Sequence, residues 1–462
     1  MNNHKTFPDP PARLHFIGIK GVAMTALAEI MKGQGYEISG SDVDERFQTD
    51  NVLKKLGISF IEGFSKDNIA PDTGAVIYST AYEENHIERK TASARGLPTW
   101  SYPEVAALLF QIYQNGIAVA GSHGKTTTAA ILSSILIEAG LDPTAIIGST
   151  VTNWGSNAKV GKSQWFILEA DEYQNKLGYY NPRFVLLTNI DYDHPDYFQS
   201  ESDYEKVFLD FVEKIPNGGA LIVWGGEPFL SKLREITKAP IITYGAEKNN
   251  DWQLSNVRIS DRGTEFAVCG KDGINHQFII PYPGFHYALN ACGAIALASY
   301  IGIAISIMQK AIALFQGTAR RLEKYGEYNG AIIIDDYAHH PTEIKATLLG
   351  LKERYAGRNL ICAFHPHTYT RTAQFINEFA ESLGLADKII LLPIFASARE
   401  KTGAVSSQDI VNLINKNQAG KAQFVSSINE AVTSLKNSLN KNDVLITMGA
   451  GDAWQIAKNL TT

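Results

Sequence analysis

Residues 118–128 read AVAGSHGKTTT, an apolar run followed by a glycine, a histidine, a second glycine, a lysine and three threonines. The apolar run has the length of a strand, and the stretch from about Thr126 to Ala139 is compatible with a helix. In a strand, turn and helix of this kind, glycines let the backbone approach an anion closely, and the helix presents free N–H groups and the positive end of its dipole. The stretch therefore predicts a phosphate-binding loop.

Lys125 and Thr126 occupy the loop positions where contact with a nucleotide is expected. The lysine would neutralise the outer phosphates, and the threonine hydroxyl would supply an oxygen ligand to magnesium. The general phosphate-loop spacing requires a glycine at position 119, where this chain has Val119, so the loop is a shortened variant. The alternative, a solvated lysine after a glycine turn, leaves the register of strand, turn and helix unexplained. We expect ATP as the nucleotide.

Apolar runs of strand length alternate with helical patterns along almost all of the 462 residues, which predicts parallel sheets covered by helices. A chain of this length usually divides into roughly two to four domains. We expect three α/β domains, with boundaries at residues 1–113, 114–317 and 318–462. The first and third are predicted to be Rossmann-like, and the central one to carry the phosphate loop on a parallel or mixed sheet.

The composition excludes several classes of protein. Apolar residues make up 45% and charged residues 19% of the chain, and a net charge of -6 argues against a general nucleic-acid binder. The three cysteines, Cys269, Cys292 and Cys362, are too few and too widely spaced for a disulfide framework or a zinc site. The apolar runs are shorter than a membrane span, and no apolar segment follows a basic start. We expect a cytoplasmic protein with neither nucleic-acid nor membrane partners.

Acidic, amide and imidazole side chains follow two later apolar strands, WFILEA (165–170) and FVLLTNI (184–190). They are Glu169, Asp171, Glu172, Asn189, Asp193, His194 and Asp196. Open α/β sheets bind their ligands at the carboxyl ends of their strands, and carboxylate oxygen is the ligand type that magnesium prefers. Solvated loop charge is the alternative for any one of these residues, but it is less favoured beside a phosphate loop.

A second glycine-containing turn, GIKGVAM (18–24), follows the first predicted strand, and Asp42 closes the next one. This pattern is similar to a dinucleotide-binding fingerprint with its ribose-binding acid. Lys20 and Ala23 stand where the fingerprint has glycine, so the match is weak. An NAD-dependent dehydrogenase is an alternative, but it gives the phosphate loop and the acidic strand ends no purpose.

Seven motifs occur in an order and spacing that resemble one family. They are GSHGKTT, EADE, TNIDYDHPD, PGFHYALNA, RRLE, DDYAHHPTE and GAGD. The chain resembles the Mur ligases, the ATP-dependent amino-acid ligases of peptidoglycan synthesis, over essentially its whole length. The segments at 335–348, 365–372 and 395–401 most resemble the branch that joins L-alanine to UDP-N-acetylmuramate. ADEY at 170–173 is similar to the branch that attaches a recycled tripeptide to the same acceptor, which remains an alternative, as does an inactive nucleotide-binding regulator.

The resemblance implies a reaction and its small-molecule partners. ATP would phosphorylate the lactoyl carboxylate of UDP-N-acetylmuramate, and the amine of L-alanine would then displace phosphate from the acyl phosphate. Such an enzyme works mainly by positioning its substrates and by neutralising charge. The implied cofactors are ATP and Mg²⁺, the N-terminal domain would bind the UDP part, and the C-terminal domain would bind the amino acid. The protein is expected to be a monomer or a homodimer.

The resemblance also implies residue roles. The residues expected to carry the chemistry are Lys125, Glu169, His194 and Arg321. Those expected to bind the nucleotide are Gly121, Ser122, His123, Gly124, Lys125, Thr126, Thr127, Asn189, His286, Asn290, Arg321 and Asp336. Thr126 and Glu169 would hold one magnesium ion, and His194 would help to hold a second. An arginine that arrives from another domain would complete the site only on domain closure.

The substrate-binding residues implied by the resemblance fall into two groups. Gly18, Gly21, Ser41 and Asp42 would lie along the UDP part, with the Lys20 cation beside the diphosphate. His339, His367, Arg371, Arg399 and Glu400 would orient the incoming amino acid. Histidines 339 and 340 have an alternative role as caps of the following helix. The chain departs from the family pattern at Tyr287, which replaces an asparagine, and at Thr368, which replaces an arginine.

Overall fold

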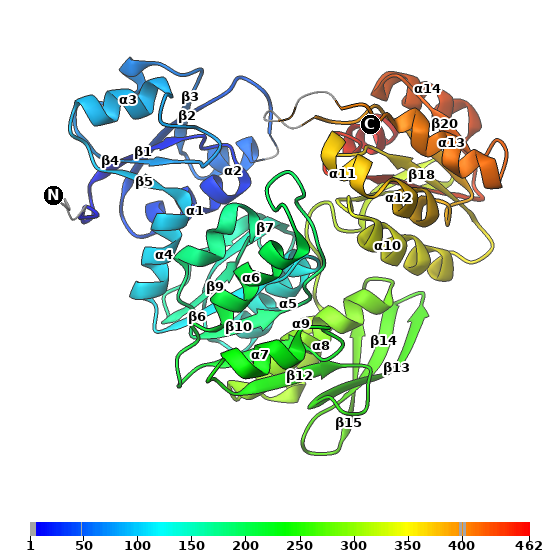
Figure 1. Ribbon diagram of the computed structural model, residues 1–462, viewed down its shortest axis with the longest axis horizontal. Coiled ribbons are helices and arrows are strands. Elements are labelled where there is room, and N and C mark those ends of the chain that lie inside the picture. The colour runs from blue at the N-terminus through cyan, green and yellow to red at the C-terminus, as the bar shows by residue number, and fades with distance from the viewer. Residues whose placement is uncertain (1–5, 48, 397–399, 401–402) are drawn as a thin grey trace.

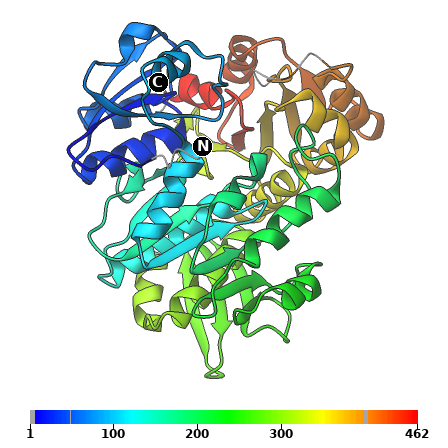
Figure 2. The ribbon, with the colours of Figure 1, turned by 60° about the vertical axis from the view of Figure 1, so that its left-hand side comes forward.

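A computed structural model describes residues 6–47, 49–396, 400 and 403–462. Three separate β-sheets, each covered by helices, organise this part of the chain. Figures 1 and 2 show the N-terminal and C-terminal domains on the same side of the central domain. The predicted three-domain α/β architecture is confirmed.

The N-terminal domain holds a five-stranded parallel sheet in the order β3-β2-β1-β4-β5. Its strands are β1 (Arg13–Ile17), β2 (Glu37–Asp42), β3 (Ser59–Glu62), β4 (Thr73–Tyr78) and β5 (Thr99–Ser101). Its helices are α1 (Val22–Gly33), α2 (Asp50–Lys55), the short 3₁₀ helix η1 (Lys66–Asn68), α3 (Ile87–Ala94) and α4 (Tyr102–Ile112). The Rossmann-like expectation matches this doubly wound order.

The central domain holds a ten-stranded mixed sheet in the order β15-β14-β13-β12-β11-β10-β6-β9-β7-β8. Its strands are β6 (Asn115–Ala120), β7 (Thr144–Val151), β8 (Ser156–Lys159), β9 (Trp165–Glu169), β10 (Phe184–Leu187), β11 (Ala220–Trp224), β12 (Ile241–Gly245), β13 (Trp252–Ser260), β14 (Gly263–Cys269) and β15 (Asn275–Ile280). Its helices are α5 (Lys125–Glu138), the 3₁₀ helix η2 (Tyr173–Tyr179), α6 (Glu201–Val212), α7 (Leu230–Ile236), α8 (Phe285–Tyr300) and α9 (Ile305–Ala313).

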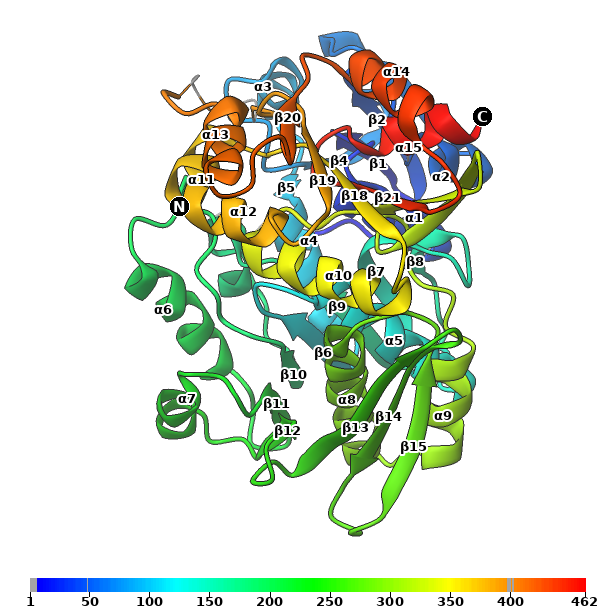
Figure 3. The ribbon, with the colours of Figure 1, turned by 90° about the vertical axis from the view of Figure 1, so that its right-hand side faces the viewer.

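The C-terminal domain holds a six-stranded sheet in the order β16-β17-β21-β18-β19-β20, in which only β16 is antiparallel to its neighbour. Its strands are β16 (Glu323–Tyr328), β17 (Ala331–Asp336), β18 (Asn359–Phe364), β19 (Lys388–Leu391), β20 (Ala422–Phe424) and β21 (Asp443–Met448). Its helices are α10 (Pro341–Arg354), α11 (Tyr369–Gln374), α12 (Ile376–Leu383), α13 (Ser407–Asn417), α14 (Ile428–Ser438) and α15 (Trp454–Thr461). Figure 3 shows α10 on the side of this domain that faces the central domain.

Strand β6 lies in the middle of the central sheet, between β10 and β9, and is parallel to both. Residues 117–120 of β6 are completely buried, as are residues 185–187 of β10 and 166–168 of β9. Parallel strands that are buried on both faces have continuous apolar sequences, and this pattern allowed the strands to be predicted from the sequence. Their carboxyl ends meet at one edge of the sheet, so the loops that begin at residues 121, 170 and 188 converge there.

The composition predicts that the cysteines form no disulfide framework and that the chain has no membrane span. Cys269, Cys292 and Cys362 are free thiols, and the last two are buried. Among the residues that the structure describes, no helix combines the length and the apolar character needed to cross a membrane.

Helix α4 joins the N-terminal domain to the central domain through Phe110. This side chain is 7% exposed, and its ring lies 5.0 Å from that of Phe166 on β9. Gly116 leaves room for it, because a Cβ there would lie 2.5 Å from the Phe110 ring.

Phe110→Ala is expected to lower the free energy of unfolding of the unit that contains the central sheet by about 3–5 kcal/mol, because it leaves a cavity between α4 and β9. Urea unfolding followed by circular dichroism measures this change. A loss below about 1 kcal/mol would contradict the packing described for this junction.

Candidate nucleotide and ligation site

The phosphate loop begins where β6 ends, and two of its glycines are required by geometry. Gly121 and Gly124 have φ values of 130° and 80°, which side chains rarely tolerate. A Cβ on Gly121 would lie 2.1 Å from Thr188 Oγ1, and one on Gly124 would lie 2.7 Å from Asn290 Oδ1. The loop is therefore packed against the end of β10 and the start of α8, both of which carry predicted nucleotide-binding residues.

Lys125 is held inside this loop. Its ammonium donates hydrogen bonds to the carbonyl oxygens of Gly121 and Ser122 and, at 2.7 Å, to Glu172 Oε2. Burial by itself lowers the pKa of Lys125, but the carboxylates of Glu172 and Asp171 outweigh it and raise this pKa above its usual value. The lysine is therefore charged and faces a carboxylate at the place where an anionic ligand is expected.

Glu172 is a site residue to which the sequence analysis gave no individual role beyond its place at a strand end. Its side chain is 1% exposed, and its Oε1 accepts a hydrogen bond from the Tyr204 hydroxyl at 3.3 Å. The Tyr204 hydroxyl also lies 2.7 Å from Ser122 Oγ. Tyr204 comes from α6, and no sequence signal distinguishes it from other buried tyrosines of helices. Together these groups form a buried polar network beneath the phosphate loop.

Thr126 and Glu169 form the first group of potential metal ligands. Thr126 Oγ1 donates to Glu169 Oε1 at 2.7 Å, and the Gly148 backbone N–H donates to Glu169 Oε2 at 2.5 Å. Burial raises the pKa of Glu169, which means that this carboxylate lacks sufficient positive charge nearby. A divalent cation at these oxygens would supply that charge, so the donor set fits a magnesium ion.

His194 belongs to a second group, separate from the first. Its Nε2 lies 3.6 Å from Glu172 Oε1 and 3.8 Å from Asp193 Oδ2, and ligand atoms of Asp171, Glu172 and His194 lie within 4.8 Å of one another. The residue adopts a left-handed backbone with φ of 57°, which is uncommon for residues other than glycine and turns the chain after β10. That these two groups hold two magnesium ions stays a prediction.

A cavity of about 430 Å³ opens beside the phosphate loop, between the central and C-terminal domains. Predicted nucleotide-binding residues that line it are His123, Gly124, Thr127, Asn189, His286, Asn290, Arg321 and Asp336. Trp224 and Glu227, which the sequence analysis missed, line its far side. Trp224 is the last residue of β11, so the strand-end rule used for β9 and β10 would have reached it. The size and the mixed lining suit a nucleoside.

Burial sets the protonation of the polar groups that face this cavity. It lowers the pKa of His286 to about 4, so this imidazole is neutral at pH 7. It raises the pKa of Asp336 to about 6, against the opposing effect of Arg321. Asp336 accepts hydrogen bonds from the backbone N–H groups of Leu322 and Ala338, each at 2.8 Å. Asp336 thereby fixes the segment that carries Arg321.

The departure at Tyr287 is accommodated by stacking. Tyr287 is 3% exposed and its ring lies 5.0 Å from that of Tyr282 and 4.6 Å from that of His286. The ring thus forms part of the cavity wall and supports His286.

A second cavity, of about 360 Å³, lies where all three domains meet. Its lining comes from residues 79–81 of the N-terminal domain, from His194 and its neighbours, and from His339, His367 and Arg371 of the C-terminal domain. The Arg371 guanidinium donates to Asp193 Oδ1 through Nε at 2.9 Å and through Nη2 at 2.8 Å. This ion pair between 4% and 5% exposed side chains fastens the C-terminal domain to the loop after β10.

The predicted UDP-binding residues of the N-terminal domain do not line the second cavity in the described part of the chain. Ser41 Oγ donates to Glu88 at 2.5 Å, and Asp42 accepts hydrogen bonds from the Lys20 N–H at 2.7 Å and the Tyr82 hydroxyl at 3.1 Å. Gly18, with φ of 82°, lies beneath the Tyr82 ring. Ser41 and Asp42 thus organise the turn that contains Gly18.

The expectation for Lys20 is wrong. Its side chain is completely buried, and its ammonium donates to the carbonyl oxygens of Val43 and Glu45 at 2.9 and 3.0 Å and contacts Glu62 at 3.2 Å. These acceptors lie beyond β2, so the cation stabilises that loop and is not placed beside a diphosphate.

The remaining predicted residues of the C-terminal domain lie around α11. Glu400 accepts hydrogen bonds from the backbone N–H groups of Tyr369 and Thr370, both at 2.7 Å, and so caps this helix. Thr368 accepts one from the Arg371 N–H at 3.4 Å, with a strained φ of 67°. Arg399 lies outside the described residues.

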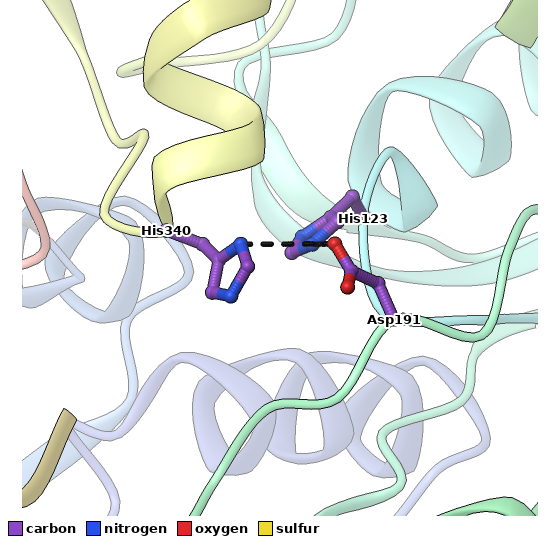
Figure 4. A group of neighbouring side chains, drawn as sticks. All are labelled: His123, Asp191 and His340. Carbon is purple, nitrogen blue, oxygen red and sulfur yellow. Dashed lines mark hydrogen bonds and ion pairs between the residues drawn. The ribbon is translucent and has the colours of Figure 1, made fainter. Parts of the chain in front are cut away.

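His123 connects the phosphate loop to the C-terminal domain (Figure 4). Its Nε2 lies 3.0 Å from Asp191 Oδ2, and its Nδ1 lies 3.4 Å from Glu343 Oε1. Burial lowers the pKa of His123, but hydrogen bonds to Asp191 and Glu343 outweigh it and raise this pKa to about 9. His340 caps α10 by accepting a hydrogen bond from the Thr342 N–H at 3.4 Å. Helix capping is one of the two roles expected for this residue from the sequence.

Asp191 and Glu343 are the two acids that the sequence analysis missed at this boundary. Asp191 follows β10 between Asn189 and Asp193, so its strand-end position could have identified it. Glu343 lies in the first turn of α10, where acids are common for a structural reason alone.

His123→Gln is expected to lower the thermal unfolding midpoint by about 2–4 °C near pH 6. Because folding raises the pKa of His123 from 6.5 to about 9, its contribution to stability is complete below pH 6.5 and is lost as the pH rises through about 9. The difference between the two proteins, measured by calorimetry from about pH 6 to 10, should therefore shrink as the pH rises. A constant difference would contradict an ion-paired His123.

Comparison with known families accounts for nearly the whole chain. Residues 13–114 match the catalytic domain of the Mur ligase family, residues 119–298 the Mur ligase middle domain, and residues 320–451 the Mur ligase glutamate ligase domain. Two relatives called UDP-N-acetylmuramate–L-alanine ligase are each 37% identical to this chain. The one from Desulfitobacterium hafniense covers 97% of this chain and 99% of its own length, and the one from Lachnoclostridium phytofermentans covers 97% and 98%.

Solved structures agree with this match. UDP-N-acetylmuramate-alanine ligase from Thermotoga maritima has a TM-score of 0.83 at 24% identity, over 97% of this chain and 98% of its own. A murein peptide ligase from Psychrobacter arcticus has a TM-score of 0.73 at 26% identity, with the same coverage. The MurF ligase from Thermotoga maritima, solved in complex with ADP, has a TM-score of 0.63 at 14% identity, over 92% and 94%. The chain belongs to the Mur ligase family.

Proposed function

We propose that this Mur ligase uses ATP and Mg²⁺ to join L-alanine to the lactoyl carboxylate of UDP-N-acetylmuramate. The observation that carries the proposal is the pair of cavities whose linings include Gly124, next to Lys125, and Tyr173, next to Glu172. The first is lined like a nucleoside site and the second is formed by all three domains. The relatives from Desulfitobacterium hafniense and Lachnoclostridium phytofermentans, whose names state this reaction, support it over nearly the full chain.

The reaction would proceed in two steps. An oxygen of the lactoyl carboxylate attacks the γ-phosphorus of ATP, the bond to the β,γ-bridging oxygen breaks, and ADP and an acyl phosphate result. The neutral amine of L-alanine then attacks the acyl carbon, loses a proton, and expels inorganic phosphate together with the former carboxylate oxygen. An amide bond is formed, and the phosphoryl group from ATP makes the former carboxylate oxygen part of a good leaving group.

Within this scheme the chain neutralises charge and orients its substrates. Lys125 would exchange Glu172 for the outer phosphates, because both anions compete for the same ammonium. Thr126 and Glu169 would hold one Mg²⁺ ion, which neutralises phosphate charge when it is bound, and His194 with Glu172 would hold another. Arg321 would reach the phosphates from the C-terminal side of the first cavity.

The amino acid would bind in the second cavity, near Arg371 and His367. Arg371 Nη1 lies 3.3 Å from His367 Nδ1, and burial lowers the pKa of His367 to about 4, so this imidazole is neutral at pH 7. Nε and Nη2 of Arg371 are paired with Asp193, which leaves Nη1 as the guanidinium nitrogen nearest His367. An N–H donor of a guanidinium suits the carboxylate of an amino acid. The aromatic rings of Tyr173 and Tyr337 also line this cavity.

A tripeptide donor is the second candidate. The observation that favours it is the ADEY segment, whose Tyr173 lies over His194 at a ring distance of 4.7 Å and lines the second cavity. The structural likeness to the murein peptide ligase from Psychrobacter arcticus also points to it.

Phosphate release from ATP, with Mg²⁺, UDP-N-acetylmuramate and each amino acid or the tripeptide in turn, distinguishes these candidates. We expect release with L-alanine and a product that is heavier by one alanyl unit in mass spectrometry. Release with the tripeptide alone would mean that the donor is the tripeptide and that the ligation reaction is unchanged. ATP binding without phosphate release would favour an inactive nucleotide-binding regulator.

Lys125→Ala is expected to lower kcat by at least about 100-fold, because it removes a cation from the outer phosphates. Initial rates of phosphate release at saturating substrates measure this loss. Lys206→Ala is a matched control. Within the described residues Lys206 pairs with the exposed Asp210 on α6, so this change should leave the rate unchanged. A Lys125→Ala enzyme that keeps its full rate would refute the phosphate-loop assignment.

Glu169→Gln is expected to raise the Mg²⁺ concentration needed for half-maximal rate by about 10-fold or more, because it removes a charged ligand oxygen. A magnesium titration of the rate at fixed ATP measures this shift. An unchanged midpoint would exclude Glu169 as a metal ligand.

A further inference from the structure

The N-terminal turn of α10 is docked on the loops that carry the phosphate site. The Thr342 hydroxyl donates to Asp191 Oδ2 at 2.8 Å, and Glu343 lies 3.4 Å from His123. The ring of His340 lies 4.7 Å from that of His123, at an angle of 32°. Figure 4 shows His123 and Asp191 approaching His340 from the central domain. We call His123, Asp191, Thr342 and Glu343 the α10 latch.

His123 has no hydrogen-bonding group left for a nucleotide. Its backbone N–H donates to Asn189 Oδ1 at 3.0 Å, and its carbonyl oxygen accepts from Thr188 Oγ1 at 2.6 Å and from Asn189 at 3.1 Å. Both ring nitrogens face carboxylates of Asp191 and Glu343. Therefore the backbone is fixed to the end of β10, while the imidazole is fixed across the domain boundary.

The latch also reaches Arg321. Glu343 Oε1 lies 3.7 Å from Arg321 Nη1, so one carboxylate contacts both the phosphate-loop histidine and the arginine that lines the first cavity. Glu343 Oε2 additionally accepts from the His339 N–H at 3.1 Å. The position of Arg321 thus depends on whether α10 is seated on the phosphate loop.

We propose that His123 is a positioning residue, which seats α10 on the phosphate loop through Asp191 and Glu343 and thereby places Arg321 over the nucleotide phosphates. This inference rests on the proposed ligation. It assigns His123 to domain docking rather than to direct nucleotide binding. The chemistry of the latch requires an imidazole that can donate from both nitrogens, which a glutamine cannot reproduce.

Hydrogen bonding accounts for the latch better than a metal ion does. His123 Nε2, Asp191 Oδ2 and a ring nitrogen of His340 lie within 4.8 Å of one another, which is compatible with a metal site. However, Asp191 Oδ2 already accepts from Thr342, and His123 also faces Glu343. A metal site predicts that Zn²⁺ raises the thermal midpoint of the wild type but not of His123→Gln, and this result would overturn the latch.

A double-mutant cycle tests the proposal. His123→Gln and Glu343→Gln are each expected to lower kcat by about 10-fold or more. The double variant is expected to lose about as much as Glu343→Gln alone, because both changes break the His123–Glu343 pair and Glu343 also contacts Arg321. The dissociation constant of ATP, measured by calorimetry, should change by less than about 3-fold in His123→Gln. Multiplicative losses of about 100-fold, or weaker ATP binding with unchanged kcat, would overturn the proposal.

Arg354→Gln is the matched control, at the other end of the same helix. Arg354 donates to the carbonyl oxygens of Ser260 and Asp261 of the central domain, both at 2.6 Å, away from the phosphate loop. Its effect on kcat should multiply with that of His123→Gln. An effect of Arg354→Gln that is fully shared with His123→Gln would mean that any loosening of α10 is sufficient, and would overturn a specific role for His123.

Small-angle scattering tests the α10 latch independently of the proposed ligation reaction. Small-angle scattering with ATP and Mg²⁺ should give a larger radius of gyration for His123→Gln than for the wild type, whether or not L-alanine is the amine donor. Equal radii would overturn the latch. If His123→Gln does not fold, Thr342→Val removes the hydroxyl that holds Asp191 and should enlarge the radius in the same way. Absence of turnover in the wild type would refute only the proposed ligation.

Discussion

A charged lysine enclosed by its own loop is the constraint on which the rest of the site depends. Lys125 is largely buried, and an ammonium in such a place is stable only when acceptors replace the water that it has lost. Two loop carbonyls and Glu172 do so. Because Glu172 follows β9 and the loop follows β6, the pairing of these strands fixes the lysine and its counter-ion together. An anionic ligand can take the place of Glu172 without leaving the ammonium unpaired.

The same principle governs the domain boundaries. The loop after β10 carries Asp191 and Asp193 at the boundary with the C-terminal domain, where Thr342 contacts Asp191 and Arg371 contacts Asp193. Each of these contacts joins an acid that follows β10 to a side chain of the C-terminal domain. The two cavities exist because these contacts hold the domains together around them. The acids of the loop after β10 therefore contribute both to the candidate site and to the docking of the C-terminal domain.

Local sequence patterns predicted the part of the site that local structure builds. The strand, turn and helix around Lys125, and the acids after β9, follow from periodicity and glycine placement, and the predicted fold and family are confirmed. Lys20 was misplaced because the course of a long side chain depends on acceptors such as Val43 that only tertiary packing brings near. The sequence analysis did not identify the antiparallel strands β13–β15, although each pairs with its neighbour in the chain across a short turn. The exact domain boundaries and the individual substrate contacts stay predictions.

The central claim is that the site activates a carboxylate by transferring a phosphoryl group to it. Isotope transfer tests this most directly, with UDP-N-acetylmuramate labelled by ¹⁸O in the lactoyl carboxylate and with ATP, Mg²⁺ and L-alanine. Since phosphate departs with the former carboxylate oxygen, we expect one labelled oxygen in each phosphate released, as measured by mass spectrometry. Amide product accompanied by unlabelled phosphate would contradict the account.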